Sequence, residues 1–273
     1  MDIVRELEQL PNTIRKYRTS EILNIFGIPI DWDHYIWQNG AGVNFIVHPE
    51  KKPYVIVSCH HDTCEQDSSP GANDNASAVA VTIDLMKRFQ EKRLANIGVM
   101  GLFFDEEELG CKGSEAYVRR HKKELAKVLG VYNVEMVGSG NIAALWPLNQ
   151  ESDGLLLRSL EEQARYQATP VIRVPHVAMR NSDHRRFLEA GVKDAFCLTM
   201  ISEVDLAVAR EYEEARAKRK SDKDLQTIMD RAPIFRNYHK PTDKSEFLSE
   251  ESMKLASDLL YGAILRVDEN RGK

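Results

Sequence analysis

The sequence predicts an α/β fold: a single three-layer domain over residues 1–273, with a central mixed, mostly parallel sheet flanked by helices. Three observations support this prediction. Short apolar runs alternate with longer amphipathic segments, an order typical of α/β proteins. The runs at 54–58 and 97–104 are apolar at nearly every position, as in strands covered on both faces. The length is sufficient for a sizeable core, and we find no linker that demands two domains.

The N-terminal part is expected to form two helices and a hairpin. Residues 2–27 predict two helices broken at Pro11 and ended by Gly27. The apolar stripe expected on them consists of Ile14, Tyr17, Ile22, Leu23 and Phe26. Short strands follow at 35–38 and 43–48, and Asn39-Gly40 between them is a hairpin-type turn.

Strands and helices then alternate along the rest of the chain. The strand at 54–58 leads into a polar loop at 63–73 and a helix from Asp74 to about Phe89. Further strands are expected at 97–104, 128–134, 142–146, 171–174 and 195–200, with helices at 113–125, 151–166, 183–190 and 246–266.

The segment 203–236 stands apart because its first part, 203–231, is highly charged. That part is helical in pattern and predicts a solvated helical pair. Because the segment directly precedes Tyr238 and His239, we regard it as a helical insertion and as a candidate lid, pocket wall or oligomer contact.

Composition and charge argue against several classes of protein. Hydrophobic residues make up 42% and charged residues 29%, as in an ordinary soluble globular protein. The formal net charge of −5 argues against nucleic acid or an acidic membrane as the main partner. No stretch approaches the roughly 18 apolar residues of a membrane span. The charged start, residues 1–6, shows no signal-peptide pattern, so we expect a cytoplasmic protein.

Histidine and carboxylate side chains stand where predicted strands end. His60 and Asp62 share one face of an extended chain, whereas His61 points to the other. A metal-binding imidazole needs an acceptor for its second nitrogen, and a carboxylate two residues on is suited to that role. The other members of this set are Asp74, Glu107, Glu108, Glu135 and His239.

These side chains are expected to converge, because ligands in open α/β sheets collect at the carboxyl ends of the strands. Converging carboxylates repel one another unless a cation neutralises them. Histidines with carboxylates suit zinc, and a carboxylate shared by two ions suits a two-metal site. Adjacent Glu107 and Glu108 cannot readily reach the same point. One is therefore expected to bind metal while the other stands free as a general base.

The four cysteines are Cys59, Cys64, Cys111 and Cys197, and none forms a Cys-x-x-Cys pair. Cys59 and Cys64 bracket the His60–Asp62 pair, which invites their interpretation as thiolate ligands. We favour the interpretation that they are small buried hydrophobic residues, because Cys59 faces away from His60 along the strand.

Six segments, taken together, resemble the di-zinc aminopeptidase family that includes secreted bacterial leucine aminopeptidases and glutamate carboxypeptidase II. Residues 58–62 resemble the His-x-Asp strand end of that family, and residues 70–77 resemble the loop with its bridging aspartate. Residues 107–114 are similar to its Glu-Glu-Leu-Gly segment, and 133–138 to its Asn-x-Asp-Met-x-Gly. The remaining matches are 182–187, with Ser-Asp-His-x-x-Phe, and 238–243, with Tyr-His-x-Pro-x-Asp.

The resemblance implies two zinc ions, with cobalt or manganese as alternatives. It places His60, Asp74 and Glu135 on one ion and Asp74, Glu108 and His239 on the other, so that Asp74 is the bridge. Glu107 falls on the family's general base and Asp62 on the carboxylate that orients the histidine. Tyr238 falls on a hydroxyl that steadies the tetrahedral intermediate.

Residues outside these positions have less definite roles. Arg180 and Asn181 are candidate substrate contacts, and Asp183 and His184 are expected to be structural near the pocket. Two departures from the family pattern are Glu135, where aspartate is usual, and Ala78, where glycine is usual. No ligand is missing, which argues against a non-catalytic relative.

The function predicted from the sequence is a metal-dependent exopeptidase, in the first place an aminopeptidase. Its partner would be a peptide or small amide, and a homo-oligomer is compatible with the sequence. Alternatives on the same site are a carboxypeptidase, a deacylase of N-acyl amino acids, or a glutaminyl cyclase-like acyl transferase. A non-catalytic binding protein that uses metal only for stability is the alternative from a different class.

Overall fold

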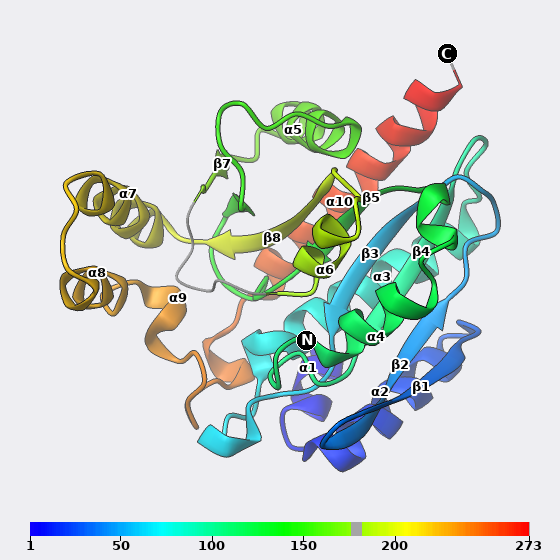
Figure 1. Cartoon of the computed structure of the whole chain (residues 1–273), viewed down its shortest axis with the longest axis horizontal. Coiled ribbons are helices and arrows are strands. Elements are labelled where there is room, and N and C mark those ends of the chain that lie inside the picture. Colours follow the sequence, from blue (N-terminus) through cyan, green and yellow to red (C-terminus); the bar gives the residue numbers. More distant parts are fainter. Residues whose placement is uncertain (176–181, 273) are drawn as a thin grey trace.

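A central sheet between layers of helices organises the chain (Figure 1), as seen in a computed structural model that describes residues 1–175 and 182–272. Eight strands lie in the order β1-β2-β4-β3-β5-β8-β6-β7 among these described residues. Their bounds are β1 Asp31–Trp37, β2 Gly40–Val47, β3 Tyr54–His60, β4 Gly98–Phe104, β5 Val128–Val134, β6 Ile142–Trp146, β7 Val171–Arg173 and β8 Ala195–Ile201.

The middle of the sheet is parallel and its margins are mixed. Strand β3 pairs parallel with both β4 and β5, and β5 pairs parallel with β8. Strands β1 and β2 form an antiparallel hairpin joined to β4, and β6 is antiparallel to β8. The predicted mixed, mostly parallel sheet flanked by helices is confirmed. Because β3, β4, β5 and β8 are parallel, their carboxyl ends meet at one edge.

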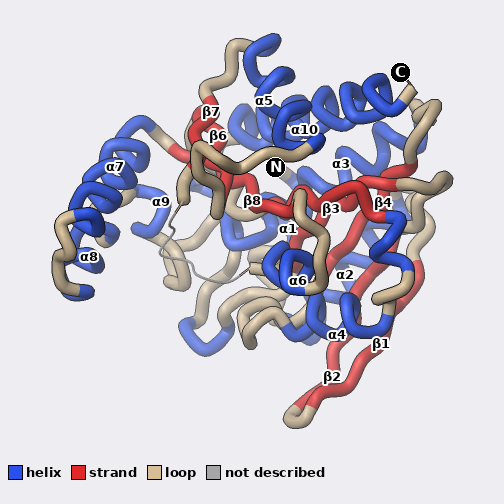
Figure 2. Tube along the Cα trace, turned by 45° about the horizontal axis from the view of Figure 1, so that its top comes forward, coloured by secondary structure: helices blue, strands red, loops and turns tan. Residues whose placement is uncertain are grey.

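Helices cover both faces of the sheet (Figures 1 and 2). One face packs on α1, α2, α3, α5 and α10, and the other on α4 and α6. The α-helix bounds are α1 Asp2–Leu7, α2 Asn12–Ile25, α3 Ala78–Glu91, α4 Lys112–Arg120, α5 Leu155–Gln167, α6 His184–Glu189, α7 Glu203–Ala217, α8 Asp222–Met229, α9 Pro233–Arg236 and α10 Glu250–Arg271.

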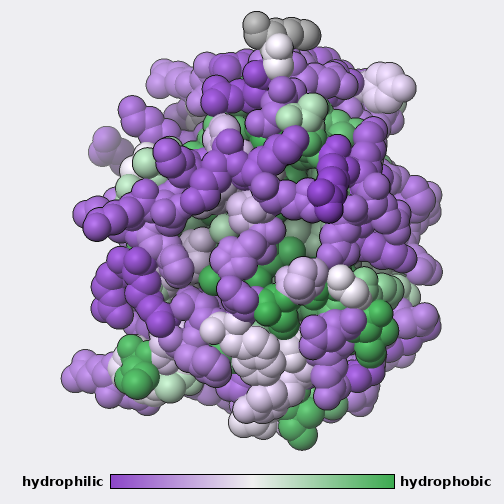
Figure 3. Space-filling model, turned by 90° about the vertical axis from the view of Figure 1, so that its right-hand side faces the viewer, coloured by the Kyte–Doolittle hydropathy of each residue, from purple (hydrophilic) through white to green (hydrophobic). Residues whose placement is uncertain are grey.

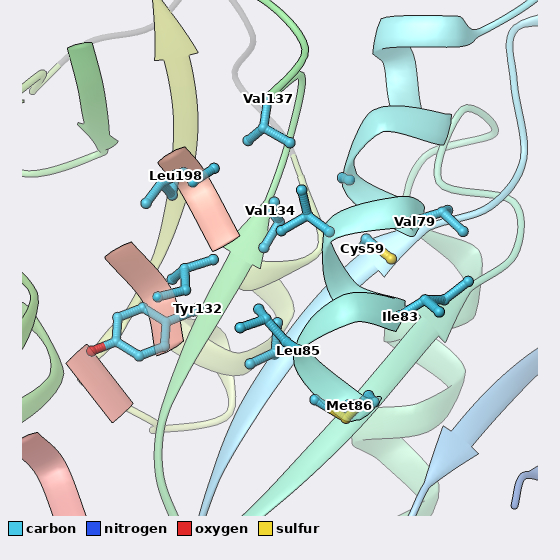
Figure 4. Packing of buried hydrophobic residues seen from close by; sticks show 14 of the residues in the cluster. Cys59, Val79, Ile83, Leu85, Met86, Tyr132, Val134, Val137 and Leu198 are labelled. Carbon is cyan, nitrogen blue, oxygen red and sulfur yellow. The ribbon is translucent and has the colours of Figure 1, made fainter. Parts of the chain in front are cut away.

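The largest buried cluster lies between the sheet and helices α3, α5 and α10. Alternate residues of the strands point into it, as the twofold strand period requires (Figure 4). Cys59 packs here beside Val79 of α3, on the face opposite to His60, so its interpretation as a buried hydrophobic residue is confirmed. Cys64 differs, because it is only half-buried and lies in a loop.

Helix α2 is turned differently from the sequence prediction. Ile14, Tyr17 and Phe26 were expected in its apolar stripe, but their side chains are 53%, 55% and 39% exposed. The buried face instead contains Arg15, Thr19 and Ser20 beside Ile22 and Leu23. The expected stripe was right for Ile22 and Leu23 and wrong for Ile14, Tyr17 and Phe26, because the first turns of the helix bury Arg15, whose hydrogen bonds are described below.

Several helix boundaries also differ from the expected ones. The helix expected from Asp74 begins only at Ala78, because residues 72–77 form an irregular turn with non-helical dihedral angles at Asp74 and Asn75. Helix α4 ends at Arg120 rather than near 125, where a short 3-10 turn at 124–127 follows. Helix α5 begins at Leu155 rather than 151, and α10 runs from Glu250 to Arg271.

The face of the molecule in Figure 3 is mostly hydrophilic, with apolar side chains in small separate patches. Among the described residues, no helix has both the length and the apolar character needed to cross a bilayer.

Candidate metal centre and active site

The ends of three parallel strands and two loops bring the predicted polar residues together. His60 ends β3, Glu107 and Glu108 lie just beyond β4, and Glu135 directly follows β5. Asp74 lies in the turn at 72–77, and His239 lies in the segment between α9 and α10. The predicted convergence at the carboxyl edge of the sheet is therefore present.

His60, Asp74 and Glu135 form one cluster, and all three side chains are buried. The Nε2 atom of His60 lies 3.2 Å from Oδ1 of Asp74 and 3.3 Å from Oε2 of Glu135. The carboxylates of Asp74 and Glu135 thus approach the same imidazole nitrogen.

Asp74, Glu108 and His239 form the second cluster. The Nε2 atom of His239 lies 3.3 Å from Oδ2 of Asp74 and 3.0 Å from Oε2 of Glu108. Asp74 therefore presents one carboxylate oxygen to each cluster. That is the arrangement required of a carboxylate shared by two ions.

Asp62 connects the ends of β3 and β4. Its Oδ1 lies 3.3 Å from Nδ1 of His60, and the same ring nitrogen lies 3.2 Å from the Asp62 carbonyl. Each oxygen of the carboxylate also accepts a 3.1 Å hydrogen bond from a backbone amide, one from Glu107 and one from Glu108. Asp62 thus contacts the histidine as the sequence predicts and, in addition, fixes the backbone of the two glutamates.

Two residues inside the matched motifs position ligands, although the sequence analysis gave them no role. Asp243 accepts hydrogen bonds from the amides of Asn73 and Asp74 at 2.9 and 3.0 Å. The Asn75 side chain donates to Oε2 of Glu135 at 2.8 Å and accepts from the Met136 amide at 3.1 Å. Their side chains replace regular backbone hydrogen bonds around the turn at 72–77, and short polar residues in a glycine-containing loop are the signal for that behaviour.

Arg15 is a functional neighbour that sequence analysis missed. Its side chain is fully buried behind the site, and its guanidinium donates hydrogen bonds to four backbone carbonyls. The acceptors are His61, Leu7, Pro70 and Gly71, at 2.8 to 3.2 Å. Burial lowers the pKa of Arg15 to about 10, while Asp62 and Asp243 oppose that shift. The group remains a cation at neutral pH and sits beside the carboxylates of the site.

Glu107 belongs to neither metal-ligand cluster. Oε1 of Glu107 accepts a 3.5 Å hydrogen bond from the Cys111 thiol, and burial raises the pKa of Glu107 well above its ordinary value. Tyr238 lies beside the second cluster, where its ring stacks on that of His239 with centroids 3.8 Å apart. It also lines a cavity together with Asp74 and Met136.

The charge balance of the site fits divalent cations. Burial, and then Asp74, raises the pKa of Glu108 to about 7. Burial lowers the pKa of His239, but Asp74 and Glu108 raise it more strongly, to about 10. Oε1 of Glu108 is buried and accepts no hydrogen bond from the part of the chain that the structure describes. Carboxylates crowded at this spacing, with imidazole nitrogens aimed between them, make a donor set that zinc prefers.

Other predicted residues lie around or outside this centre. His61 points away from it, stacks on Phe45 and hydrogen bonds to the Val43 carbonyl, as strand parity predicts. Asp183 and His184 are buried nearby. The neighbouring Ser182 hydroxyl donates to Oε1 of Glu135 at 2.6 Å. The candidate substrate contacts Arg180 and Asn181 lie outside the described residues.

Comparison with known protein families assigns the chain to one of them. The model of peptidase family M28 matches residues 43–264, which include every residue of the two clusters. The chain belongs to peptidase family M28. The chain thus has the fold of a metallopeptidase family, and its two clusters are candidate metal-binding groups.

Three similar proteins cover different shares of the chain. Aminopeptidase YwaD of Bacillus subtilis (strain 168) is 28% identical over 229 residues, which are 80% of this chain and 41% of that protein. The structure of BSAP, a zinc aminopeptidase from Bacillus subtilis, has a TM-score of 0.62 at 23% identity and covers 84% of this chain and 50% of that one. Glutaminyl cyclase from Porphyromonas gingivalis has a TM-score of 0.67 at 15% identity and covers 96% of both chains.

These structural likenesses show that the fold is shared. The chain spans about half the length of these two Bacillus subtilis aminopeptidases, whereas it matches the glutaminyl cyclase over nearly the whole length.

The segment 203–236 contributes to a cavity beside the centre. Helices α7, α8 and α9 pack against β6 and β8 through an apolar cluster that includes Met136, Ile201 and Ile234. The cavity there is lined mainly by apolar side chains, and it shares Met136, Asp205 and Ile234 with the cavity at Tyr238. Of the three roles considered for this segment, the wall of a pocket is the one that its position favours.

Proposed function

We propose that this M28 protein is a two-metal exopeptidase that acts as an aminopeptidase. The observation that supports the proposal is the carboxylate of Asp74, with one oxygen 3.2 Å from His60 and the other 3.3 Å from His239. A carboxylate placed between two complete three-residue clusters suits a pair of ions rather than one.

The chain's own residues would hold two zinc ions in these clusters. His60, Asp74 and Glu135 would bind one ion, and Asp74, Glu108 and His239 the other. Zinc bound there supplies a water of lowered pKa and polarises the scissile carbonyl. Cobalt and manganese accept similar donor sets, so both are candidates for the metal that the protein uses.

Glu107 would then act as the general base. It lies next to Glu108 without being part of either cluster, and burial raises its pKa, which makes it a stronger base. Glu107 takes the proton of the attacking water and passes it to the leaving amine. The Tyr238 hydroxyl, in the cavity beside Asp74, donates a hydrogen bond to the developing oxyanion.

The cavity beside Met136 supports a preference for apolar amino-terminal residues. Met136 directly follows the ligand Glu135, and the cavity walls include Trp146, Ile201 and Phe235. An apolar side chain placed there gains about 1 to 3 kcal/mol relative to a smaller one. We therefore propose substrates with a free amino end and a leucine-like or aromatic first residue.

A second candidate is cyclisation of amino-terminal glutamine. Its support is the match over 96% of both chains with a glutaminyl cyclase, against half-length matches with the aminopeptidases. We rank it second, because His60 and Glu135 complete a second metal cluster beside the one that contains His239.

One experiment separates these candidates. Purified protein is assayed on free-amino and N-acetylated dipeptides, on amino-acid anilides and on a glutaminyl peptide, with bound zinc counted in the same sample. Cleavage only of substrates with a free amino end, at close to two zinc ions per chain, supports the aminopeptidase. Cyclisation, preference for blocked or C-terminally free substrates, or one zinc ion per chain would reject it. Cytoplasmic location and a homo-oligomer remain predictions that this assay does not address.

A further inference from the structure

Cys64, Asp67 and His239 form a third group of metal-ligating side chains outside the two clusters described above. One ligand atom from each residue lies within 4.8 Å of the other two. The Cys64 thiol donates a 3.2 Å hydrogen bond to Oδ2 of Asp67. The three residues offer sulfur, carboxylate oxygen and imidazole nitrogen, a set that favours zinc and other soft divalent cations.

The loop that contains Cys64 and Asp67 is fixed at its base, so the group does not depend on a free segment. The Asn12 side chain donates to the Thr63 carbonyl at 2.8 Å and accepts from the Thr63 amide at 2.9 Å. The Thr63 hydroxyl donates to the Ser69 carbonyl at 3.1 Å and closes the loop.

Solvent access distinguishes this group from the inner clusters. Asp67 is exposed and Cys64 is half-buried, whereas His60, Asp74 and Glu135 are buried. A cation can therefore reach the group without entering the substrate cavity. His239 is the residue that the group shares with the inner cluster of Asp74 and Glu108.

We propose that Cys64, Asp67 and His239 form an outer site for a third divalent cation, which is occupied when zinc exceeds two ions per chain and then inhibits the enzyme. If the His239 imidazole turns toward the outer cation, the inner ion keeps only Asp74 and Glu108 and loses its third protein ligand. The inhibition rests on the proposed two-metal function, whereas binding at the outer site does not.

Binding at this site releases a proton. Burial, and then the hydrogen bond to Asp67, raises the pKa of Cys64 to about 12, so the free sulfur carries its proton at neutral pH. The incoming cation forms a bond to sulfur as the S–H bond breaks, and the proton leaves to solvent.

Cobalt titration tests the site without any assay of activity. Metal-free protein is titrated with Co²⁺, and the near-ultraviolet charge-transfer absorption of thiolate-bound cobalt is recorded. We expect this absorption only after the first two equivalents, and its loss in Cys64→Ser. In Asp67→Asn we expect an outer-site affinity at least about tenfold weaker, since loss of even a supporting contact at a metal site costs that much. The exposed Gln66→Ala, in the same short helix at 65–67, serves as the matched control and should behave as wild type.

Three outcomes of the cobalt titration would overturn the outer site. Thiolate absorption within the first two equivalents would place Cys64 in the inner centre. The absence of this absorption at any cobalt concentration, or its persistence in Cys64→Ser, would show that Cys64 binds no cation.

Zinc titration of activity tests the competition for His239. Each protein's rate is normalised to its own rate at two equivalents of zinc. Wild type and Gln66→Ala should lose activity as zinc rises, and Cys64→Ser should need at least about tenfold more zinc for the same loss. Equal inhibition of wild type and Cys64→Ser would overturn the competition. An inactive wild type with a normal cobalt titration would count against the proposed function and leave the outer site standing.

Discussion

The Nε atom of Arg15 donates a hydrogen bond to the carbonyl of His61 at 2.8 Å, across 46 positions of sequence. His61 follows the ligand His60, and the other guanidinium nitrogens bind the carbonyls of Pro70 and Gly71, just before the turn that contains Asp74. A single buried cation thus fixes the two segments that supply His60 and Asp74 to the first cluster. It also offsets part of the negative charge of the neighbouring carboxylates.

Arg15→Lys should lower both stability and zinc affinity. Lysine keeps the charge but lacks the planar fork, so two or more of the carbonyls lose their donor. Each buried unsatisfied group costs about 1 to 3 kcal/mol. We expect the free energy of unfolding to fall by at least about 2 kcal/mol and zinc to bind more weakly, measured by urea unfolding and by competition with a chelator. Arg18→Lys is the control, because Arg18 pairs with Glu6 and Glu21 at the surface of the same helix. If Arg15→Lys and Arg18→Lys lowered the free energy of unfolding and the zinc affinity equally, Arg15 would have no special part in fixing the centre.

Glu107→Gln should separate catalysis from metal binding. Glutamine keeps the shape of the side chain and cannot take a proton, so kcat should fall by roughly 10²- to 10⁴-fold. Zinc content should stay near the wild-type value, because Glu107 belongs to neither cluster. The matched control is Glu106→Gln, since Glu106 accepts hydrogen bonds from Tyr35 and Trp37 away from the centre. Near-normal turnover in Glu107→Gln would show that another group is the base.

Ala209→Phe should narrow substrate preference. Ala209 lines the apolar cavity from α7, and a phenylalanine there fills space that a large substrate side chain would use. We expect kcat/KM for leucine and phenylalanine substrates to fall by roughly tenfold or more, with little change for alanine substrates. Ala207→Phe, at an exposed position of the same helix, is the control. A uniform loss over all substrates would mean that the cavity does not select the side chain.

His184 should make stability depend on pH. Burial, and then Arg185, lowers the pKa of His184 to about 3, and its ring packs edge-on against Trp146. Between pH 6.5 and 3 the unfolded chain therefore binds a proton at this residue that the folded chain does not. Stability consequently falls as pH falls, by up to about 1.4 kcal/mol per pH unit.

His184→Gln lacks this titration. The advantage of wild type over the variant in free energy of unfolding should shrink by roughly 2 kcal/mol between pH 7 and pH 5, measured by urea unfolding at each pH. A difference that stays constant over this range would show that His184 is protonated in the folded protein.

The fold and the convergence of the candidate ligands were predictable, because the sequence patterns of both are regular. Buried strands are continuous apolar runs. Where such strands are parallel, the residues directly after them lie at the same edge of the sheet. His60, Glu108 and Glu135 follow this rule and meet as predicted.

The supporting residues were not predictable in the same way. Arg15 binds backbone carbonyls, which every residue has, so no partner residue marks its role. Its burial places Ile14 and Tyr17 on the exposed side of α2, and for these two residues the predicted apolar stripe was wrong. Asn75 and Asp243 bind backbone amides, and only the folded turn at 72–77 shows which ones. Cys64 was assigned to the interior because sequence patterns do not give the exposure of a loop.

The contacts of Asp243 have a consequence for synthesis of the protein. The backbone amides of Asn73 and Asp74 donate to the Asp243 carboxylate, which lies 170 and 169 positions later in the chain. His239, which contacts Asp74, comes from the same late segment. A nascent chain that has already folded strands β3 to β5 still lacks the anchor of its bridging aspartate and one imidazole. The ribosome must therefore release residue 243 before the two clusters can assemble, so the candidate metal centre is completed only late in translation.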